Sequence, residues 1–109
     1  MKQLIKLIFT ISFIVASVSA FAAADIEAGK EKSTACAACH GADGVSASPM
    51  FPTIAGQHAD YMVKALNDYK SGERKNPIMQ ANVASLSDED IVNLAAYFAQ
   101  QSGLKTLKK

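Results

Sequence analysis

The two cysteines of this 109-residue chain, Cys36 and Cys39, stand three positions apart and are followed directly by His40 in the motif CAACH. Thiols at this spacing suit three kinds of chemistry: a redox-active dithiol, part of a zinc site, or the covalent attachment of haem. The five-residue pattern CxxCH is the signature of c-type haem attachment, in which each thiol adds to one vinyl group and the histidine can reach the iron. Other features of the sequence distinguish among these three kinds of chemistry.

A helix places the three side chains of this motif together. Residues of an α-helix turn by about 100° each, so Cys36, Cys39 and His40 fall within roughly 100° of one another. A thioredoxin-like dithiol needs a βαβ context and gives the histidine no role. A zinc site needs four ligands, and only His40 and His58 could complete it, at unsuitable spacing. The motif therefore favours haem attachment.

The first 24 residues have the pattern of a secretory signal peptide. Lys2 and Lys6 precede an uncharged apolar run over residues 7–18, and small residues follow it. The uncharged stretch approaches the length of a transmembrane anchor, but its last third is Ala and Ser, which favours cleavage, after Ala22 or Ala24. We therefore predict a cleaved signal peptide over residues 1–24, a periplasmic location and no stable membrane insertion after cleavage.

The remaining domain, over residues 25–109, is small and nearly neutral. It holds nine Lys and Arg against ten Asp and Glu, a balance that indicates no nucleic-acid partner. A domain of about 85 residues buries little more than about 60% of its unfolded surface and usually needs an additional stabilising element, such as disulfides or a bound group. Because a disulfide across three residues would constrain almost nothing of the unfolded chain, we expect a bound group to complete the core.

The pattern of apolar residues and helix caps predicts an all-α domain with three main helices and two long loops. We expect helices over residues 26–40, 58–73 and 88–102. Asp25 is a cap for the first, Gly72 a stop for the second, and Ser87 with Asp90 forms a capping box before the third.

Two segments between these helices read as loops. Residues 41–57 hold three glycines and two prolines, and residues 74–85 contain Pro77, which bars the helical conformation at Asn76. Residues 104–109 are expected to fray.

With these elements in place, the chain resembles the class I c-type cytochromes. The segments that carry the resemblance are AGK, CAACHGADG, PMFPTIAGQ, YKSGERKNPIM and LSDEDIVNLAAYFA, and it covers residues 25–101. The chain is similar to the small bacterial monohaem members and to one half of the periplasmic dihaem cytochromes. The resemblance implies a small cytochrome c fold wrapped around one covalent haem c, because a second CxxCH is absent. It also implies an electron carrier rather than an enzyme, with respiratory reductases or oxidases as partners.

The resemblance implies a methionine as the second axial ligand opposite His40. Met79 matches the family's methionine in NPIM, and the loop expected there could aim its thioether at the iron. A His/Met pair would raise the reduction potential and fill the sixth position, which suits electron transfer. Met62 is expected in the core and Met50 in the wall of the haem pocket.

Three further haem contacts follow from the resemblance. The carbonyl of Pro52 matches the family's acceptor for the ring N–H of His40, Ile54 is expected to pack on the haem, and Arg74 to pair with a propionate. The alternatives are a purely loop-shaping Pro52 and a solvated Arg74.

The family's helix crossing is expected where Gly29 of the first helix meets the last helix near Tyr97 or Phe98. Ser33 stands where several members have an aromatic residue, so the crossing is expected to be less tightly packed.

Two other functions remain open on the sequence alone. One is a haem-based sensor of small ligands, or a peroxidase-like protein, with a displaceable Met79; the other is a cytochrome subunit bound to a larger oxidoreductase. Three lysines, Lys64, Lys70 and Lys75, could rim the haem edge for docking or could simply be solvated.

Overall fold

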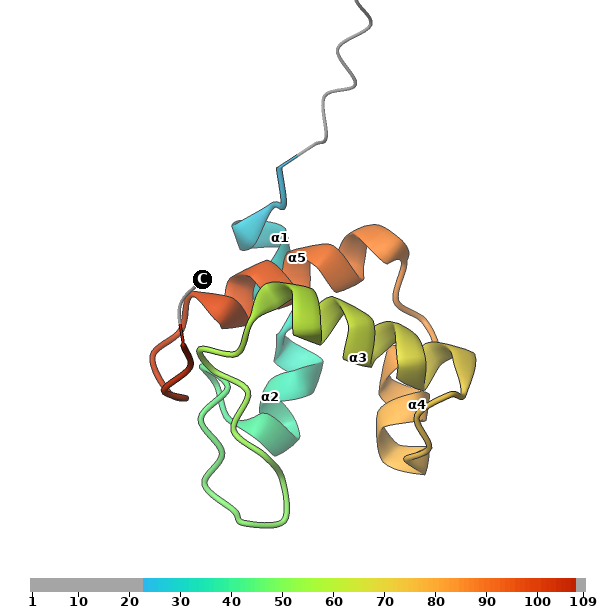
Figure 1. The fold of residues 1–109 in the computed structure, drawn as a ribbon, viewed down its shortest axis with the longest axis horizontal. Helices are drawn as coiled ribbons and strands as arrows, with labels where there is room; N and C mark the ends of the chain where they lie inside the picture. Colours follow the sequence, from blue (N-terminus) through green and yellow to red (C-terminus); the bar gives the residue numbers. More distant parts are fainter. Residues whose placement is uncertain (1–22, 108–109) are drawn as a thin grey trace, which may run out of the picture.

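The computed structural model describes residues 23–107, so the predicted signal peptide lies almost entirely outside the described residues. Within that range the chain forms helices and no strand (Figure 1). The elements are α1 (Ile26–Lys32), α2 (Thr34–His40), α3 (Ala59–Ser71), α4 (Pro77–Val83) and α5 (Asp88–Ala99). The predicted all-α class is confirmed, with five helices in place of three. None of the described helices has the length and apolar character needed to cross a membrane.

The helix predicted over residues 26–40 is divided at Ser33, so its continuity was wrongly predicted. The Ser33 hydroxyl donates to the carbonyl of Lys30 at 2.6 Å, and the residue is 4% exposed. A serine hydroxyl that bonds the backbone in this way competes with the regular helical pattern. α1 crosses α5, and α2 continues from α1 toward the site (Figure 1).

The loop predicted over residues 74–85 is wrong in its centre, where α4 forms. Asn76 caps this helix, since its Oδ1 accepts from the backbone N–H groups of Ile78 and Met79, each at 3.1 Å. Pro77 does keep Asn76 extended, but it then occupies the first helical position, where a missing N–H breaks no helical hydrogen bond. Met79 therefore stands on a short helix and not on irregular backbone.

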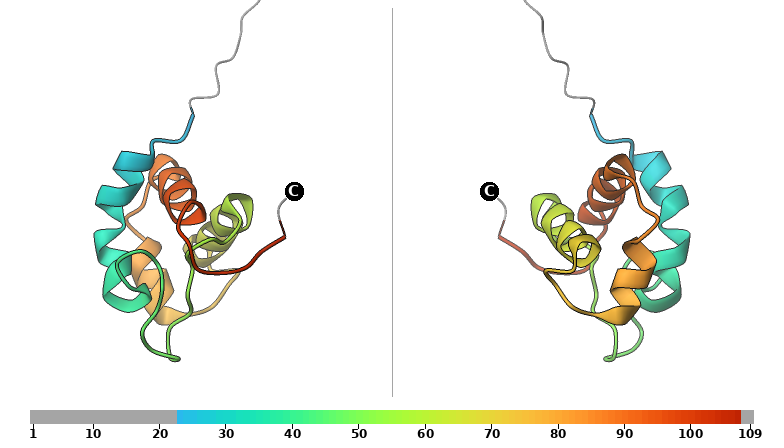
Figure 2. Two further views of the ribbon diagram at one scale, coloured as in Figure 1. Left: turned by 90° about the vertical axis from the view of Figure 1, so that its left-hand side faces the viewer. Right: turned by 90° about the vertical axis from the view of Figure 1, so that its right-hand side faces the viewer.

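The core forms where α5 lies between α1 and α3, and α3 in turn contacts α4 (Figure 2). Its buried cluster is apolar and comes from α3 and α5: Met62, Leu94, Ala95, Tyr97 and Phe98. The expected core position of Met62 is confirmed by its 7% exposure.

The predicted crossing of the first and last helices is present at Gly29. A Cβ on this glycine would lie 2.1 Å from the backbone oxygen of Asn93 and 3.0 Å from the Cβ of Tyr97. The Asn93 side chain accepts from the backbone N–H of Asp25 at 2.8 Å, which holds the start of α1 on α5. The two helices approach closely at this crossing, and Asn93 is the nearest residue to Gly29.

The predicted capping box of α5 is also confirmed. Ser87 Oγ accepts from the backbone N–H of Asp90 at 3.0 Å, and Asp90 Oδ2 accepts from the backbone N–H of Ser87 at 3.0 Å. The bond from the Ser87 backbone is the main reason that the pKa of Asp90 lies below its ordinary value. This contribution to stability is therefore complete above the unfolded-state pKa and is lost as the pH falls through the folded-state pKa.

We expect Ser87→Ala to lower the free energy of unfolding by about 1 kcal/mol at neutral pH, since the substitution leaves an N–H of the first turn of α5 without its partner. Urea unfolding of the haem-loaded protein measures this. Ser85→Ala, two residues before the cap, is the matched control and should change stability by less than about 0.5 kcal/mol. Equal effects of the two substitutions would show that the cap is not stabilising.

Candidate functional site

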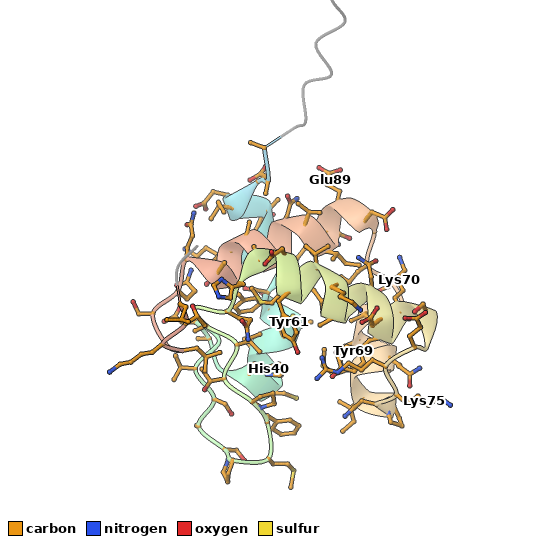
Figure 3. The ribbon with its side chains drawn as sticks, viewed as in Figure 1. His40, Tyr61, Tyr69, Lys70, Lys75 and Glu89 are labelled. Carbon is orange, nitrogen blue, oxygen red and sulfur yellow. The ribbon has the colours of Figure 1, made fainter. Side chains whose placement is uncertain are left out.

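A cavity of about 460 Å³ lies beneath α3, between α2 with its following loop on one side and α4 on the other. Figure 3 shows His40, Tyr61 and Tyr69 directed toward this region from α2 and α3. The structure brings all seven residues predicted for the site to its wall: Cys36, Cys39, His40, Pro52, Ile54, Arg74 and Met79. A volume of this size is in the range of cofactor and ligand pockets.

The chemistry of the two thiols opposes the dithiol interpretation. Cys36 and Cys39 are half-buried and free of a disulfide. Burial is the main cause that raises the pKa of the Cys36 thiol, and the neighbouring Cys39 acts in the same direction. A dithiol oxidoreductase needs the reverse, a thiol whose pKa is lowered. His58 stands at the N-cap position of α3 and does not line the cavity. It therefore does not complete a zinc site with the residues of the CAACH motif.

The imidazole of His40 is held in one orientation. Its Nδ1–H donates to the carbonyl oxygen of Pro52 at 2.7 Å, because a carbonyl oxygen can only accept. The ring is buried, with 7% exposure, and the proton on Nδ1 leaves Nε2 with a free electron pair. A neutral histidine fixed through its second nitrogen is the usual arrangement of a metal-ligating imidazole.

The loop over residues 41–57 returns Pro52 to the end of α2. The carbonyl of Gly44 accepts from the backbone N–H groups of Ile54 at 2.8 Å and Ala55 at 3.0 Å. Ser46 N–H donates to the hydroxyl of Thr53 at 3.0 Å, which closes the same loop one step further out. The sequence predicted a loop here but gave no indication that it closes on itself.

The C-terminal segment supports this loop, contrary to the fraying expected after residue 103. Gly56 N–H donates to the carbonyl of Phe98 at 2.9 Å, and Leu104 N–H donates to the carbonyl of Ala55 at 2.8 Å. The hydroxyl of Thr106 also bonds the carbonyl of Gly56 at 3.2 Å. The segment that positions Pro52 is thus anchored to the end of α5.

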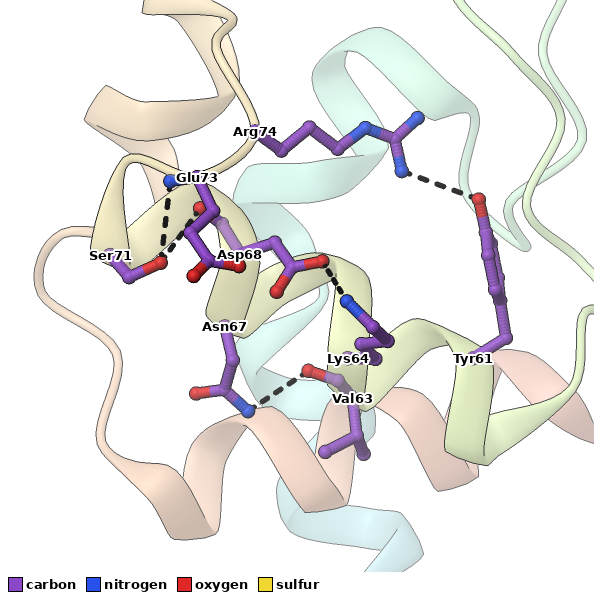
Figure 4. A network of polar contacts seen from close by, with 8 residues as sticks. All are labelled: Tyr61, Val63, Lys64, Asn67, Asp68, Ser71, Glu73 and Arg74. Atoms are coloured by element: carbon purple, nitrogen blue, oxygen red, sulfur yellow. Dashed lines mark hydrogen bonds and ion pairs between the residues drawn. The ribbon is translucent and has the colours of Figure 1, made fainter.

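Arg74 closes another side of the cavity together with two tyrosines of α3. Its Nη1 donates to the hydroxyl of Tyr61 at 3.3 Å, as Figure 4 shows, and its Cζ lies 4.8 Å from the ring centre of Tyr69. The hydrogen bond to Tyr61 is the main cause that raises the pKa of Arg74. The sequence analysis did not predict these two contacts, so the part of the tyrosines in the site was missed.

Met79 reaches the cavity wall from α4, one turn after the Asn76 cap, and is half-buried. Met50 also lines the cavity, as expected, but its side chain is 80% exposed. Two thiols, one oriented imidazole and the thioethers of three methionines, Met50, Met62 and Met79, stand in a mostly apolar wall. They fit a covalently bound haem, since imidazole and thioether are donors that iron of this kind accepts.

The helices and this donor set define an all-α domain that binds haem. Residues 26–102 match the family model described as cytochrome c. The chain therefore belongs to the cytochrome c family, and the predicted resemblance and covalent haem c are confirmed.

Two curated relatives show what share of a related protein's length this chain covers. It is 43% identical over 100 residues to cytochrome c4 of Pseudomonas aeruginosa, an alignment that covers 92% of this chain and 48% of the relative. It is 40% identical over 82 residues to cytochrome c-554(548) of Halomonas halodenitrificans, covering 72% of this chain and 99% of the relative. The chain thus spans about half the length of the cytochrome c4 relative and matches the whole of a shorter one.

A solved structure agrees with these alignments. The crystal structure of reduced recombinant cytochrome c4 from Pseudomonas stutzeri superposes with a TM-score of 0.71 at 43% identity, covering 75% of this chain and 48% of that chain. These relatives do not favour the alternatives of a ligand sensor or a peroxidase.

Proposed function

We propose that this cytochrome c is an electron carrier and not an enzyme, and that it passes single electrons between redox proteins through one haem c. The observation that carries the proposal is that two thiols, an oriented imidazole and methionine thioethers, that of Met79 among them, line one mostly apolar cavity. The bound haem would supply reversible one-electron chemistry. The protein's part is to hold that group, exclude water from it and set its potential.

In this proposal each donor has its own role. Cys36 and Cys39 would form the two thioether links to the haem, and His40 would bind the iron through Nε2 while Pro52 fixes its ring through Nδ1. Met79 would supply a thioether to the iron, and a thioether favours the reduced state relative to a second imidazole. With His40 and Met79 both bound to the iron, oxygen and peroxide would have no open coordination site.

Two remaining wall residues act on the periphery of the group. Ile54 lines the cavity and would pack on the haem. Arg74, already placed at the cavity wall by Tyr61 and Tyr69, would pair with a propionate.

The names of two relatives support redox enzymes as partners. The chain is 52% identical over 63 residues, 57% of its length and 29% of the relative's, to the thiosulfate dehydrogenase electron acceptor of Stutzerimonas stutzeri. It is 38% identical over 74 residues to the cytochrome subunit of sulfide dehydrogenase of Chlorobaculum tepidum. We therefore propose that this protein exchanges electrons with respiratory or dehydrogenase-type oxidoreductases.

The proposed place of action is the periplasm. The basic, apolar and small-residue pattern of residues 1–24 supports export, with residues 25–109 as the mature domain. Mass spectrometry of the protein recovered from the periplasm tests both the location and the cleavage after Ala22 or Ala24.

We expect Met79→Ala to remove the weak red absorption band by which ferric haem reports an iron–methionine bond. The reduction potential should fall by an amount on the order of 0.1 V, within the range of about 0.8 V that axial ligands span. Visible spectroscopy and a redox titration of the wild-type and variant proteins measure both effects.

Met50→Leu is the matched control for this experiment, because Met50 is another methionine of the cavity wall and is 80% exposed. It should keep the red band. A band that persists in Met79→Ala, or a high-spin spectrum in the wild type, would contradict the assignment of Met79 and the electron-transfer mechanism built on it.

A further inference from the structure

The segment after α5 lies against the loop that carries Pro52 (Figure 1). Leu104 N–H donates to the carbonyl of Ala55 at 2.8 Å, which joins this segment to the loop three residues after Pro52. We call residues 103–106 the C-terminal strap. A strap held in this way can act on the loop, and so on the oxygen that the loop presents to His40.

Gly103 packs against the loop so closely that no side chain fits between them. A Cβ at this position would lie 2.7 Å from the Cβ of Ala55, 2.9 Å from the carbonyl oxygen of Ala55 and 3.3 Å from Cγ2 of Thr53. Carbon atoms in contact stand about 3.5–4.0 Å apart, so a methyl group here would overlap its neighbours. Ala55 is fully buried, so it is packed from other directions as well.

The loop approaches the strap just as closely at Gly56. A Cβ on this residue would lie 2.9 Å from the carbonyl oxygen of Leu104 and 3.1 Å from that of Gln101. Gly56 N–H also donates to the carbonyl of Phe98 at 2.9 Å, which ties the loop to the end of α5. Backbone therefore lies directly on backbone, and no side-chain rotation can adjust this contact.

Thr53 connects this contact with the site. The carbonyl that accepts from the His40 ring belongs to the peptide unit between Pro52 and Thr53, and a peptide unit is planar and stiff. Thr53 is held a second time, because its hydroxyl oxygen accepts from the backbone N–H of Ser46 at 3.0 Å. The position of the acceptor oxygen therefore depends on what packs against Thr53, and Gly103 does so.

We propose that the C-terminal strap is a positioning element for His40 and that Gly103 is its positioning residue. By packing on Thr53, the strap holds the carbonyl of Pro52 at 2.7 Å from Nδ1 of the ring. A carbonyl that accepts from Nδ1–H makes Nε2 more basic, and a more basic nitrogen favours ferric over ferrous iron. The strap thus lowers the reduction potential. This inference rests on the proposed function, in which His40 binds the iron.

The first test is Gly103→Ala in the haem-loaded protein, with the Nδ1–H proton of His40 followed by NMR in the reduced state. A weaker hydrogen bond to Pro52 should move this resonance upfield and speed its exchange with solvent at least about tenfold. The reduction potential should rise by about 28 mV or more, which is a threefold change in the equilibrium constant at about 59 mV per tenfold.

Thr106 offers a milder variant that keeps the test decisive if Gly103→Ala does not fold. Its hydroxyl donates to the carbonyl of Gly56 at 3.2 Å, so Thr106→Val, which has nearly the same shape, loosens the strap without crowding the loop. Exchange of the His40 proton should become at least about threefold faster, and the potential should rise. Thr106→Ser keeps the hydroxyl and should stay within about 1.5-fold of the wild-type exchange rate.

Ser87→Ala is the control for a loss of stability alone. It removes the cap at the opposite end of α5 and does not touch the strap. The potential and the proton of His40 should therefore keep their wild-type values although the variant is less stable. Equal effects of Ser87→Ala and Gly103→Ala on these two readouts would overturn the inference. A fall in potential in Gly103→Ala, or equal behaviour of the Val and Ser variants at position 106, would overturn it too.

A redox titration of the wild type separates this inference from the proposed function. If the wild type titrates reversibly with one electron while the His40 proton ignores the strap variants, only the positioning role fails. If the wild type does not titrate reversibly, the electron-carrier function fails. Exchange of the His40 proton then still decides whether the strap holds the ring.

Discussion

Gly29→Ala is expected to destabilise the domain by about 3 kcal/mol or more, although alanine is the better helix former. The new Cβ would lie 2.1 Å from the backbone oxygen of Asn93, and backbone of a central helix cannot move aside as a flexible side chain could. Relief requires α1 to separate from α5, which would also stretch the bond between the Asp25 N–H and the Asn93 side chain. Denaturant unfolding of the haem-loaded protein measures the loss.

Gly72→Ala is the matched control for this substitution. It makes the same chemical change at a glycine where the nearest obstacle, Nε2 of Gln80, is 3.8 Å from the new Cβ. Its cost should be about 1–2 kcal/mol, since Gly72 has a φ of 86° and alanine is strained in that region. If Gly29→Ala were instead more stable than the wild type by about 1 kcal/mol, its helix propensity would outweigh the contact and the close crossing would be disproved.

Local patterns predicted those parts of the fold that local contacts determine. The capping box of α5 involves residues three apart, Ser87 and Asp90, and the stop of α3 requires only that Gly72 take a left-handed conformation. Both signals lie within one turn of helix, so the sequence alone was sufficient to place them.

The parts that were wrongly predicted depend on choices that the local sequence leaves open. Pro77 keeps the backbone of Asn76 extended, and a proline can also occupy the first position of a helix. In the structure a helix begins at Pro77, and Asn76 caps its first turn. Ser33 is compatible with a helix, but here its hydroxyl bonds the backbone and the helix breaks. The closure of the loop on Gly44 joins residues ten positions apart, which no periodic pattern reveals.

The candidate site also has a part that the local sequence predicted and a part that it did not. Cys36, Cys39 and His40 share one turn of helix, so their chemistry could be inferred from spacing. Pro52 and Met79 reach the same cavity through a loop and a separate helix, and only a family resemblance indicated them in advance. The support of Arg74 by Tyr61 and Tyr69 depends on how the segment after α3 folds back, and the sequence did not indicate it.

We expect the chain without attached haem, as in the double variant Cys36→Ala/Cys39→Ala, to be largely unfolded. The largest fully buried side chains among the described residues are Ile91, Leu94 and Val83, a small core for a domain of this length. Without the cofactor the helices would have to enclose a cavity of about 460 Å³. The apolar wall that the cofactor covers would then face water, a loss that the small net stability of a typical domain cannot absorb.

Far-UV circular dichroism of the purified variant measures this loss, and thermal unfolding shows whether any cooperative structure remains. The single variant Cys36→Ala keeps one possible link through Cys39 and is the control for the loss of a buried thiol. It should retain most of its helix content when haem is attached, because the filled cavity, and not the number of links, holds α2 and α4 against α3. A near-native spectrum of the haem-free double variant would contradict this prediction. It would show that apolar contacts among the helices are sufficient to fold the domain without the cofactor.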